Sequence, residues 1–259
     1  MNRAAKSPAF NFTADTSAAQ QLAAPLIIAP ETVLSEELGF KGRFADGAGQ
    51  LAISVFHAEY NNFQGTTSLP TTPLSFIIVN AKQLRTQGVE IEGAFHLTPS
   101  FSLSGGASYV NAAFTRFPNA PCYAGQVAAQ GCVFTPAGAF YDISGTSPPN
   151  APHWSANLAA RYEAGGKVVR RFAEGRVSYK DDVHFGLGRN PADIQPGFSL
   201  VNLSAGAEHV RSGLSIQIYA RNVFDKTFAA RITPNNGALL QFFPMEARLS
   251  VGMTVEKKF

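Results

Sequence analysis

The chain has 259 residues, of which 15% are charged and 45% hydrophobic, and its net charge is +3. This composition excludes an intrinsically disordered chain, and the charge is too small to indicate nucleic acid or another polyanion as a partner. No run of 18 consecutive apolar residues is present, so the sequence predicts no transmembrane helix. Gly and Phe are abundant and long helical patterns are scarce, which favours an all-β fold.

Residues 1–30 read as an irregular segment, either an outer loop or an additional strand, and residues 31–259 as the sheet-forming part. The apolar run "LAAPLIIA" is too short and too late for the hydrophobic region of a signal peptide.

Nine segments have strand character, and the connections between them alternate in length. Short turns at 45–49, 98–100, 163–167 and 209–213 alternate with longer connections at 64–73, 117–151, 186–197 and 226–242. Such alternation is typical of transmembrane β-barrels, which have short turns at one end and long loops at the other. The predicted strands are 33–45, 50–63, 74–97, 100–116, 152–163, 168–185, 198–209, 213–225 and 243–259.

Most of these strands have one apolar and one polar face. In "GLSIQIYAR", Leu214, Ile216 and Ile218 alternate with polar side chains, and in "GVEIEGAF" two glutamates alternate with apolar residues. Charges facing a dry core would be costly, whereas a wide, wet lumen tolerates them. The segment 243–259 keeps the alternation throughout and predicts one long terminal strand.

The number of predicted strands is odd, whereas bacterial single-chain barrels normally close with an even number. Either an element before the first strand is missing, or residues 7–29 supply a tenth strand. The fold class predicted is therefore an antiparallel transmembrane β-barrel, partial, with about 9–10 strands of a larger one.

Four segments in this order resemble the TonB-dependent outer-membrane receptors: "LIIAPETVLSEELGFKGRF", "AISVFHAEYNNFQ", "RTQGVEIEGAF" and "IYARNVFDKTF". The resemblance covers about residues 25–259. It implies a barrel of about 22 strands with a plugged lumen. It also implies a place in the outer-membrane lipid of a Gram-negative bacterium, where such receptors import iron–siderophore complexes, cobalamin or glycans.

The resemblance also assigns partners. Phe259, the terminal aromatic residue, is similar to the signal that the barrel-assembly machinery reads. The plug domain, the segment that contacts TonB and more than half of the strands have no counterpart in this sequence. The chain is therefore expected to be the C-terminal part of a receptor, reaching TonB only through an absent plug and not competent for transport alone.

The two cysteines, Cys122 and Cys132, lie ten residues apart in a loop-like segment. This spacing, with no other cysteine present, favours a loop disulfide in an oxidising compartment over free thiols. A metal site would need further ligands, and no histidine or carboxylate lies between them.

Ligand contacts, if the chain has any, are expected on the long connections. The candidates are Phe134, Phe140, Tyr141, Arg189 and Asn190, and the alternative is that these loops have no ligand role. The sequence has no metal-ligand spacing and no phosphate-binding glycine loop, so no cofactor is predicted.

Two other readings remain open at the level of sequence. In "SYKDDVHF", Asp181, Asp182 and His184 crowd together, as in a small outer-membrane hydrolase that activates water; a solvated loop edge explains the cluster more simply. A soluble all-β binding module is the other alternative, which the polar inward positions and the alternating connections disfavour.

Overall fold

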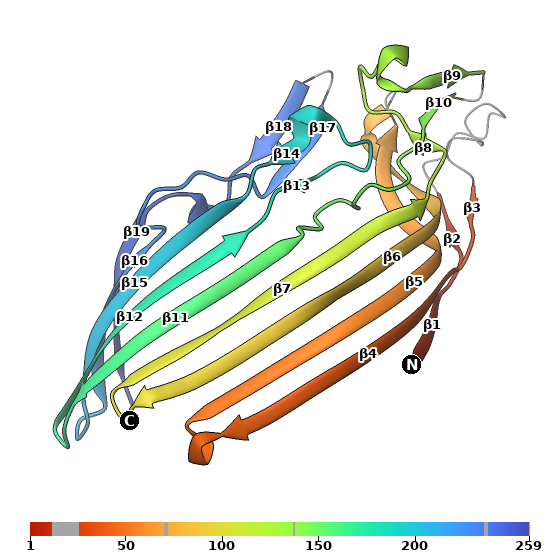
Figure 1. Cartoon of the computed structure of the whole chain (residues 1–259). Coiled ribbons are helices and arrows are strands. Elements are labelled where there is room, and N and C mark those ends of the chain that lie inside the picture. Colours follow the sequence, from red (N-terminus) through yellow and green to blue (C-terminus); the bar gives the residue numbers. More distant parts are fainter. Residues whose placement is uncertain (12–25, 70–71, 137, 236–237, 259) are drawn as a thin grey trace.

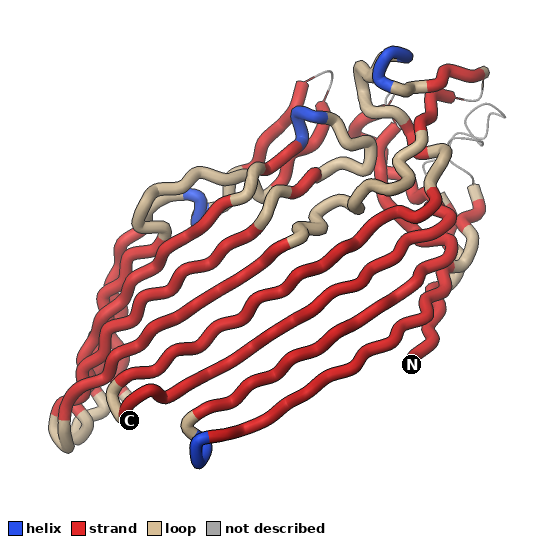
Figure 2. Tube along the Cα trace, in the orientation of Figure 1, coloured by secondary structure: helices blue, strands red, loops and turns tan. Residues whose placement is uncertain are grey.

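The structure is a computed structural model that describes residues 1–11, 26–69, 72–136, 138–235 and 238–258. Ten strands of this part of the chain form one antiparallel sheet (Figures 1 and 2). In spatial order they are β1 (Asn2–Lys6), β4 (Glu31–Phe44), β5 (Gly49–Leu69), β6 (Thr72–Thr98), β7 (Phe101–Arg116), β11 (Trp154–Gly165), β12 (Val169–Lys180), β15 (Phe198–His209), β16 (Leu214–Arg221) and β19 (Ser250–Lys257).

The sheet is open, because β1 and β19 each have one strand neighbour among the described residues. Figure 1 shows the short turns at one end of the sheet, here called the turn end. The long connections gather at the opposite end, the loop end, together with four small sheets. An antiparallel sheet with short and long connections at opposite ends confirms the predicted partial barrel.

The small elements occupy the long connections and the N-terminal segment. They are β2 (Ala9–Phe10) with β3 (Ile27–Ile28); β8 (Ala120–Pro121), β9 (Val133–Thr135) and β10 (Gly138–Tyr141); β13 (Val183–His184) with β14 (Ile194–Gln195); and β17 (Arg231–Asn235) with β18 (Ala238–Phe242). Short 3₁₀ turns are η1 (Ala45–Gly47), η2 (Ala128–Gln130), η3 (Pro191–Asp193) and η4 (Met245–Ala247). Across the described ranges, no helix has both the length and the apolar character needed to cross a membrane.

All nine predicted strands are present in the predicted order, but several bounds differ; for example, the strand predicted at 168–185 ends at Lys180 and the one at 213–225 ends at Arg221. The tenth strand of the described sheet is Asn2–Lys6, which pairs with β4, whereas most of the alternative segment 7–29 lies outside the described residues. Residues 64–73 are not a long loop, because β5 and β6 continue as a projecting hairpin to Leu69 and from Thr72. The ladder is interrupted at Asn62, which has φ +54, and resumes from the pair of Phe63 with Ala81 through this polar stretch to the pair of Ser68 with Phe76.

The terminal strand is also shorter than predicted. It begins at Ser250, while Met245–Ala247 forms η4, whose backbone is closed by the Ala247 amide donating to Pro244 O. Proline has no amide hydrogen for a strand ladder, and the Asn222 side chain donates to Glu246 O in place of a strand partner. The alternating polarity of residues 243–249 therefore belongs to a turn and not to a strand, and Ala247 is buried in this turn.

One face of the sheet carries an apolar band. Cross-strand partners share a face, and the exposed residues Leu38, Val55, Val89, Tyr109 and Trp154 form one continuous row over five strands. The band continues on the last strands, where Ile218 is 57% and Met253 65% exposed. An apolar surface of this extent is not compatible with a water-exposed sheet, which argues against the soluble module.

The opposite face is polar and carries ion pairs. Arg161 bonds Glu163 at 2.7 Å and Glu174 at 3.3 Å, and its guanidinium lies over the Phe172 ring at 4.1 Å. Arg170 and Glu208 form a further pair between β12 and β15 at 3.4 Å. On β16, the polar side chains Ser215 and Gln217 are half-buried, whereas the alternating apolar ones, such as Ile218, are exposed. This difference is expected when the polar face is the concave one.

Candidate functional site: the loop-end cluster

The connections at the loop end pack on the projecting β5–β6 hairpin. Their contact is a buried apolar cluster that includes Leu84 of β6, Phe114 of β7, Ile143 of the β7–β11 connection and Leu187 of the β12–β15 connection. Phe114 meets Phe117 edge to face, with ring centroids 5.3 Å apart. Burial of these side chains fixes two long connections against the strands, so the loop end is a packed layer.

The N-terminal segment is held on the same hairpin by amide side chains. The Asn11 side chain pairs with the backbone of Ile78, donating to its O at 2.8 Å and accepting from its N at 2.7 Å. The Gln64 side chain donates to Ser7 O and to Ala29 O, both at 3.0 Å. These contacts hold both described ends of the segment 7–29 on the hairpin, and residues 12–25 of that segment lie outside the described residues.

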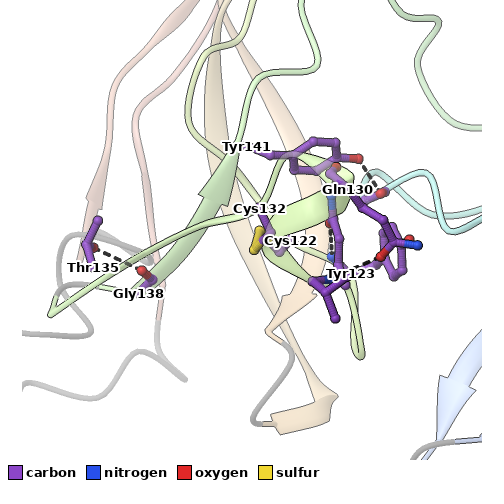
Figure 3. The surroundings of a disulfide bond; sticks show 10 residues. Cys122, Tyr123, Gln130, Cys132, Thr135, Gly138 and Tyr141 are labelled. Carbon is purple, nitrogen blue, oxygen red and sulfur yellow. Dashed lines mark hydrogen bonds between the residues drawn. A yellow bond between two sulfur atoms is a disulfide. The ribbon is translucent and has the colours of Figure 1, made fainter.

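Cys122 and Cys132 are joined by a disulfide within the β7–β11 connection, and both are buried (Figure 3). The loop that they close is also held by glutamine side chains: Gln126 Oε1 accepts from the Tyr123 amide, and Gln130 Oε1 accepts from the Val127 amide. A covalent bond and several hydrogen bonds therefore act on the same eleven-residue segment, counted from Cys122 to Cys132.

The five predicted ligand residues lie in two environments. Phe134 on β9 is 63% exposed, whereas Phe140 and Tyr141 on β10 pack against the apolar cluster. The Tyr141 hydroxyl donates to Gly188 O of the next connection. Burial raises the pKa of Tyr141 to about 12, against the opposing effect of Arg189, so this hydroxyl keeps its proton.

Arg189 and Asn190 are engaged within the protein. Arg189 donates from Nη1 to the backbone and the hydroxyl oxygen of Ser147, both at 3.2 Å, and Asn190 caps η3 by accepting from the Ala192 amide. The structure thus brings Tyr141 and Arg189 into one cluster and leaves Phe134 apart from it, on the surface.

The predicted hydrolase residues are not brought together. Asp181 accepts from the Tyr179 hydroxyl at 3.0 Å and from the Asp182 amide, whereas His184 bonds Asp193 and Arg189. Both ring nitrogens of His184 are engaged by Asp193 and Arg189, and not by Asp181 or Asp182. The described residues include no group of three or more histidine, cysteine and acidic side chains that could hold a metal ion.

Asp193 is a residue that sequence reasoning missed. Its carboxylate accepts from the Gly186 amide at 2.9 Å and contacts His184 Nδ1 at 3.1 Å. Burial raises the pKa of Asp193, while His184, the Gly186 amide and Arg189 act in the opposite direction. Its nine-residue separation from His184 spans a turn and η3, and no local pattern in the sequence points to the contact.

A hollow of about 360 Å³ lies on the polar face of the sheet, over five strands from β4 to β11. Its floor consists of small residues such as Ala52, Ser104 and Gly106, and Lys41 and Glu92 are among its polar residues. At Gly106 the neighbouring strand also approaches closely, since a Cβ there would lie 2.9 Å from Ile91 O.

Comparison with solved structures places the fold. The ferric yersiniabactin uptake receptor FyuA from Yersinia pestis matches 99% of this chain and 34% of its own, with TM-score 0.71 and 15% identity. The siderophore receptor PiuA from Acinetobacter baumannii matches 91% and 30%, with TM-score 0.63 and 19% identity. The ferric-catecholate import receptor Fiu from E. coli K12 matches 89% and 28%, with TM-score 0.59 and 18% identity.

The chain therefore spans about a third of the length of the receptors that it resembles. Comparison with curated protein sequences gives no match. The family described as TonB dependent receptor-like, beta-barrel, matches residues 3–223, which is most of the chain and nearly all strands of the main sheet. By this match, the chain belongs to the TonB-dependent receptor β-barrel family.

Proposed function

We propose that the chain acts in the outer membrane of a Gram-negative bacterium, as barrel wall and outer loops of a receptor that imports a scarce nutrient. The observation that carries this proposal is the division of the sheet into an exposed apolar face and a concave face with paired charges. Strands of this kind satisfy their backbone groups between neighbours while apolar side chains meet lipid.

The cargo class that we favour is a ferric siderophore, ahead of cobalamin or a glycan. Support comes from the similar structures, whose names describe ferric yersiniabactin, siderophore and ferric-catecholate receptors. In this proposal, coupling to TonB requires a plug that the described strands and loops do not supply, and the barrel-assembly machinery reads Phe259. Phe259 lies outside the described residues.

For the cargo contacts we propose a division of labour among the five candidates. Phe134 contacts the cargo directly, since its ring is exposed at the loop end. Phe140 and Tyr141 hold β10, the strand that pairs with β9, against the apolar cluster, and Arg189 and Asn190 hold the neighbouring connection. Aromatic side chains on a rigid support bind with little loss of conformational entropy.

Binding to outer membranes tests this proposal. Membranes from cells with and without the chain are incubated with radiolabelled iron in catecholate, hydroxamate and phenolate siderophores, and with labelled cobalamin and a maltodextrin. We expect saturable binding of one ferric siderophore, weakened about tenfold by Phe134→Ser, a loss of one buried aromatic contact. Val168→Ser, an exposed apolar position at the turn end, is the matched control.

Saturable binding of cobalamin or maltodextrin instead would contradict the proposed cargo class but agree with the proposed receptor function. Absence of the chain from the outer membrane would overturn the function itself. Equal binding by Phe134→Ser and the unchanged chain would remove Phe134 from the site.

A further inference from the structure

The β7–β11 and β12–β15 connections at the loop end are linked by a small set of polar contacts. The Asn150 amide donates to His184 O at 2.9 Å, the Tyr141 hydroxyl donates to Gly188 O, and Arg189 donates to Ser147. Arg189 adopts φ +51, a left-handed conformation that costs free energy for a residue with a side chain. Its contacts therefore hold a backbone geometry that the turn alone does not favour.

The tautomer of neutral His184 is set by its two neighbours. His184 Nε2 lies 3.1 Å from Arg189 Nη2, and because a guanidinium has only donors, this ring nitrogen must be the acceptor. The proton is therefore on Nδ1, which donates to Asp193 Oδ1 at 3.1 Å. Both side chains are largely buried, with 13% of His184 and 6% of Asp193 exposed.

We propose that His184, Arg189 and Asp193 form a proton-sensitive clasp between the β7–β11 and β12–β15 connections, which loosens when His184 takes a second proton. That proton occupies the nitrogen that accepts from Arg189, so a hydrogen bond is replaced by two cations 3.1 Å apart. Asp193 stays with the imidazolium, which it contacts directly. Arg189 withdraws and releases Ser147.

The other ionisable groups around the clasp do not provide the same switch. Tyr141 lies near Arg189, and burial raises the pKa of Tyr141 to about 12, so its hydroxyl stays neutral in acid. The apolar contacts of Leu187 and the Tyr141–Gly188 contact do not titrate in the acid range, so the connections loosen without separating. The inference concerns the loops alone and does not depend on which cargo they meet.

Amide hydrogen exchange on the chain in outer membranes tests the clasp. Exchange is followed at pH 7.5 and 5.0, at times matched for the intrinsic exchange rate, in peptides covering 142–152, where the Asn150 amide bonds His184 O. Peptides from β15 serve as an internal reference. We expect protection in 142–152 to fall at least tenfold at pH 5.0, as for loss of a hydrogen bond to a charged group, and β15 to be unchanged.

Two variants assign the proton. His184→Gln, whose amide can donate to Asp193 and accept from Arg189, should abolish the pH effect. His153→Gln, an exposed histidine of the β7–β11 connection, should keep it. Equal protection at both pH values in the unchanged chain, a persistent effect in His184→Gln, or loss of the effect in His153→Gln would overturn the proposal.

Discussion

Arg161 carries the densest set of polar contacts on the concave face. It joins Glu163 and Glu174 and lies over the Phe172 ring. We expect Arg161→Ala to lower the free energy of unfolding by about 1–2 kcal/mol, since partly exposed ion pairs and a cation–π contact each contribute less than about 1 kcal/mol. The urea midpoint of the chain extracted in detergent measures this, with Arg211→Ala in an exposed turn as the control.

Gly105 tests how closely the strands approach. A Cβ at this position would lie 2.3 Å from the backbone oxygen of Asn157, and a backbone atom cannot rotate away as a side chain can. We expect Gly105→Ala to destabilise the sheet by about 1–3 kcal/mol, as in an overpacked core. Gly166→Ala, where a Cβ meets nothing within 4 Å, should leave the same urea midpoint unchanged. Equal midpoints for the two variants would contradict the close approach.

At the scale of a strand, β16 separates two chemical environments at adjacent residues. Ile218 belongs to the exposed apolar face, and Gln217 is half-buried on the polar face. Lysine on the lipid side costs about 2–4 kcal/mol at the bilayer midplane, whereas a wet lumen tolerates it. Ile218→Lys should therefore reduce the chain recovered in outer membranes severalfold, and Gln217→Lys should not. If instead Gln217→Lys reduced recovery and Ile218→Lys did not, the polar face would meet lipid and the apolar face water.

The disulfide acts on one connection and leaves the sheet unaffected. Replacing both Cys122 and Cys132 by serine removes a link that closes a short loop, worth about 3 kcal/mol for loops of this size. We expect faster cleavage by added protease between these two positions. The β4–β5 and β15–β16 hairpins should stay resistant to the protease. If the double-serine variant and the unchanged chain are cleaved at the same rate, the glutamine contacts alone are enough to hold the loop.

Some elements could be predicted from the sequence and others could not. The alternation of Leu214, Ile216 and Ile218 with polar residues correctly predicted β16, because no proline or turn residue interrupts it. The same alternation misled in 243–249, where Pro244 ends the ladder and Ala247 is buried by the turn. The β5–β6 projection was missed because its polar residues pair through backbone groups, which carry no periodic side-chain signal.

The candidate site was predicted only in part, for a related reason. The residues of the loop end were identified by their place in long connections. Their contacts, such as those of Asp193 with His184 and of Arg189 with Ser147, form when two connections fold onto the same apolar cluster. Sequence spacing holds no information about which connections meet, so Asp181 and Asp182 were chosen for His184 in place of Asp193.

At the scale of the whole molecule, assembly into the membrane precedes every other property. We expect Phe259→Ala to lower the amount of chain in outer membranes severalfold, since the terminal aromatic residue is proposed as the assembly signal. Lys258→Ala is the neighbouring control. A quantitative immunoblot of outer-membrane fractions measures both, and equal recovery of the two variants would remove Phe259 from the signal.

The central claim is that the apolar face of the sheet meets lipid and the polar face meets water. The sequence has two cysteines and both are in the disulfide, so single cysteines can be introduced without background labelling. In outer membranes, a charged maleimide should label Asn157→Cys, Gln217→Cys and Thr254→Cys. It should fail to label Leu158→Cys, Ile218→Cys and Met253→Cys until the membrane is dissolved. Equal labelling within each neighbouring pair would contradict the account.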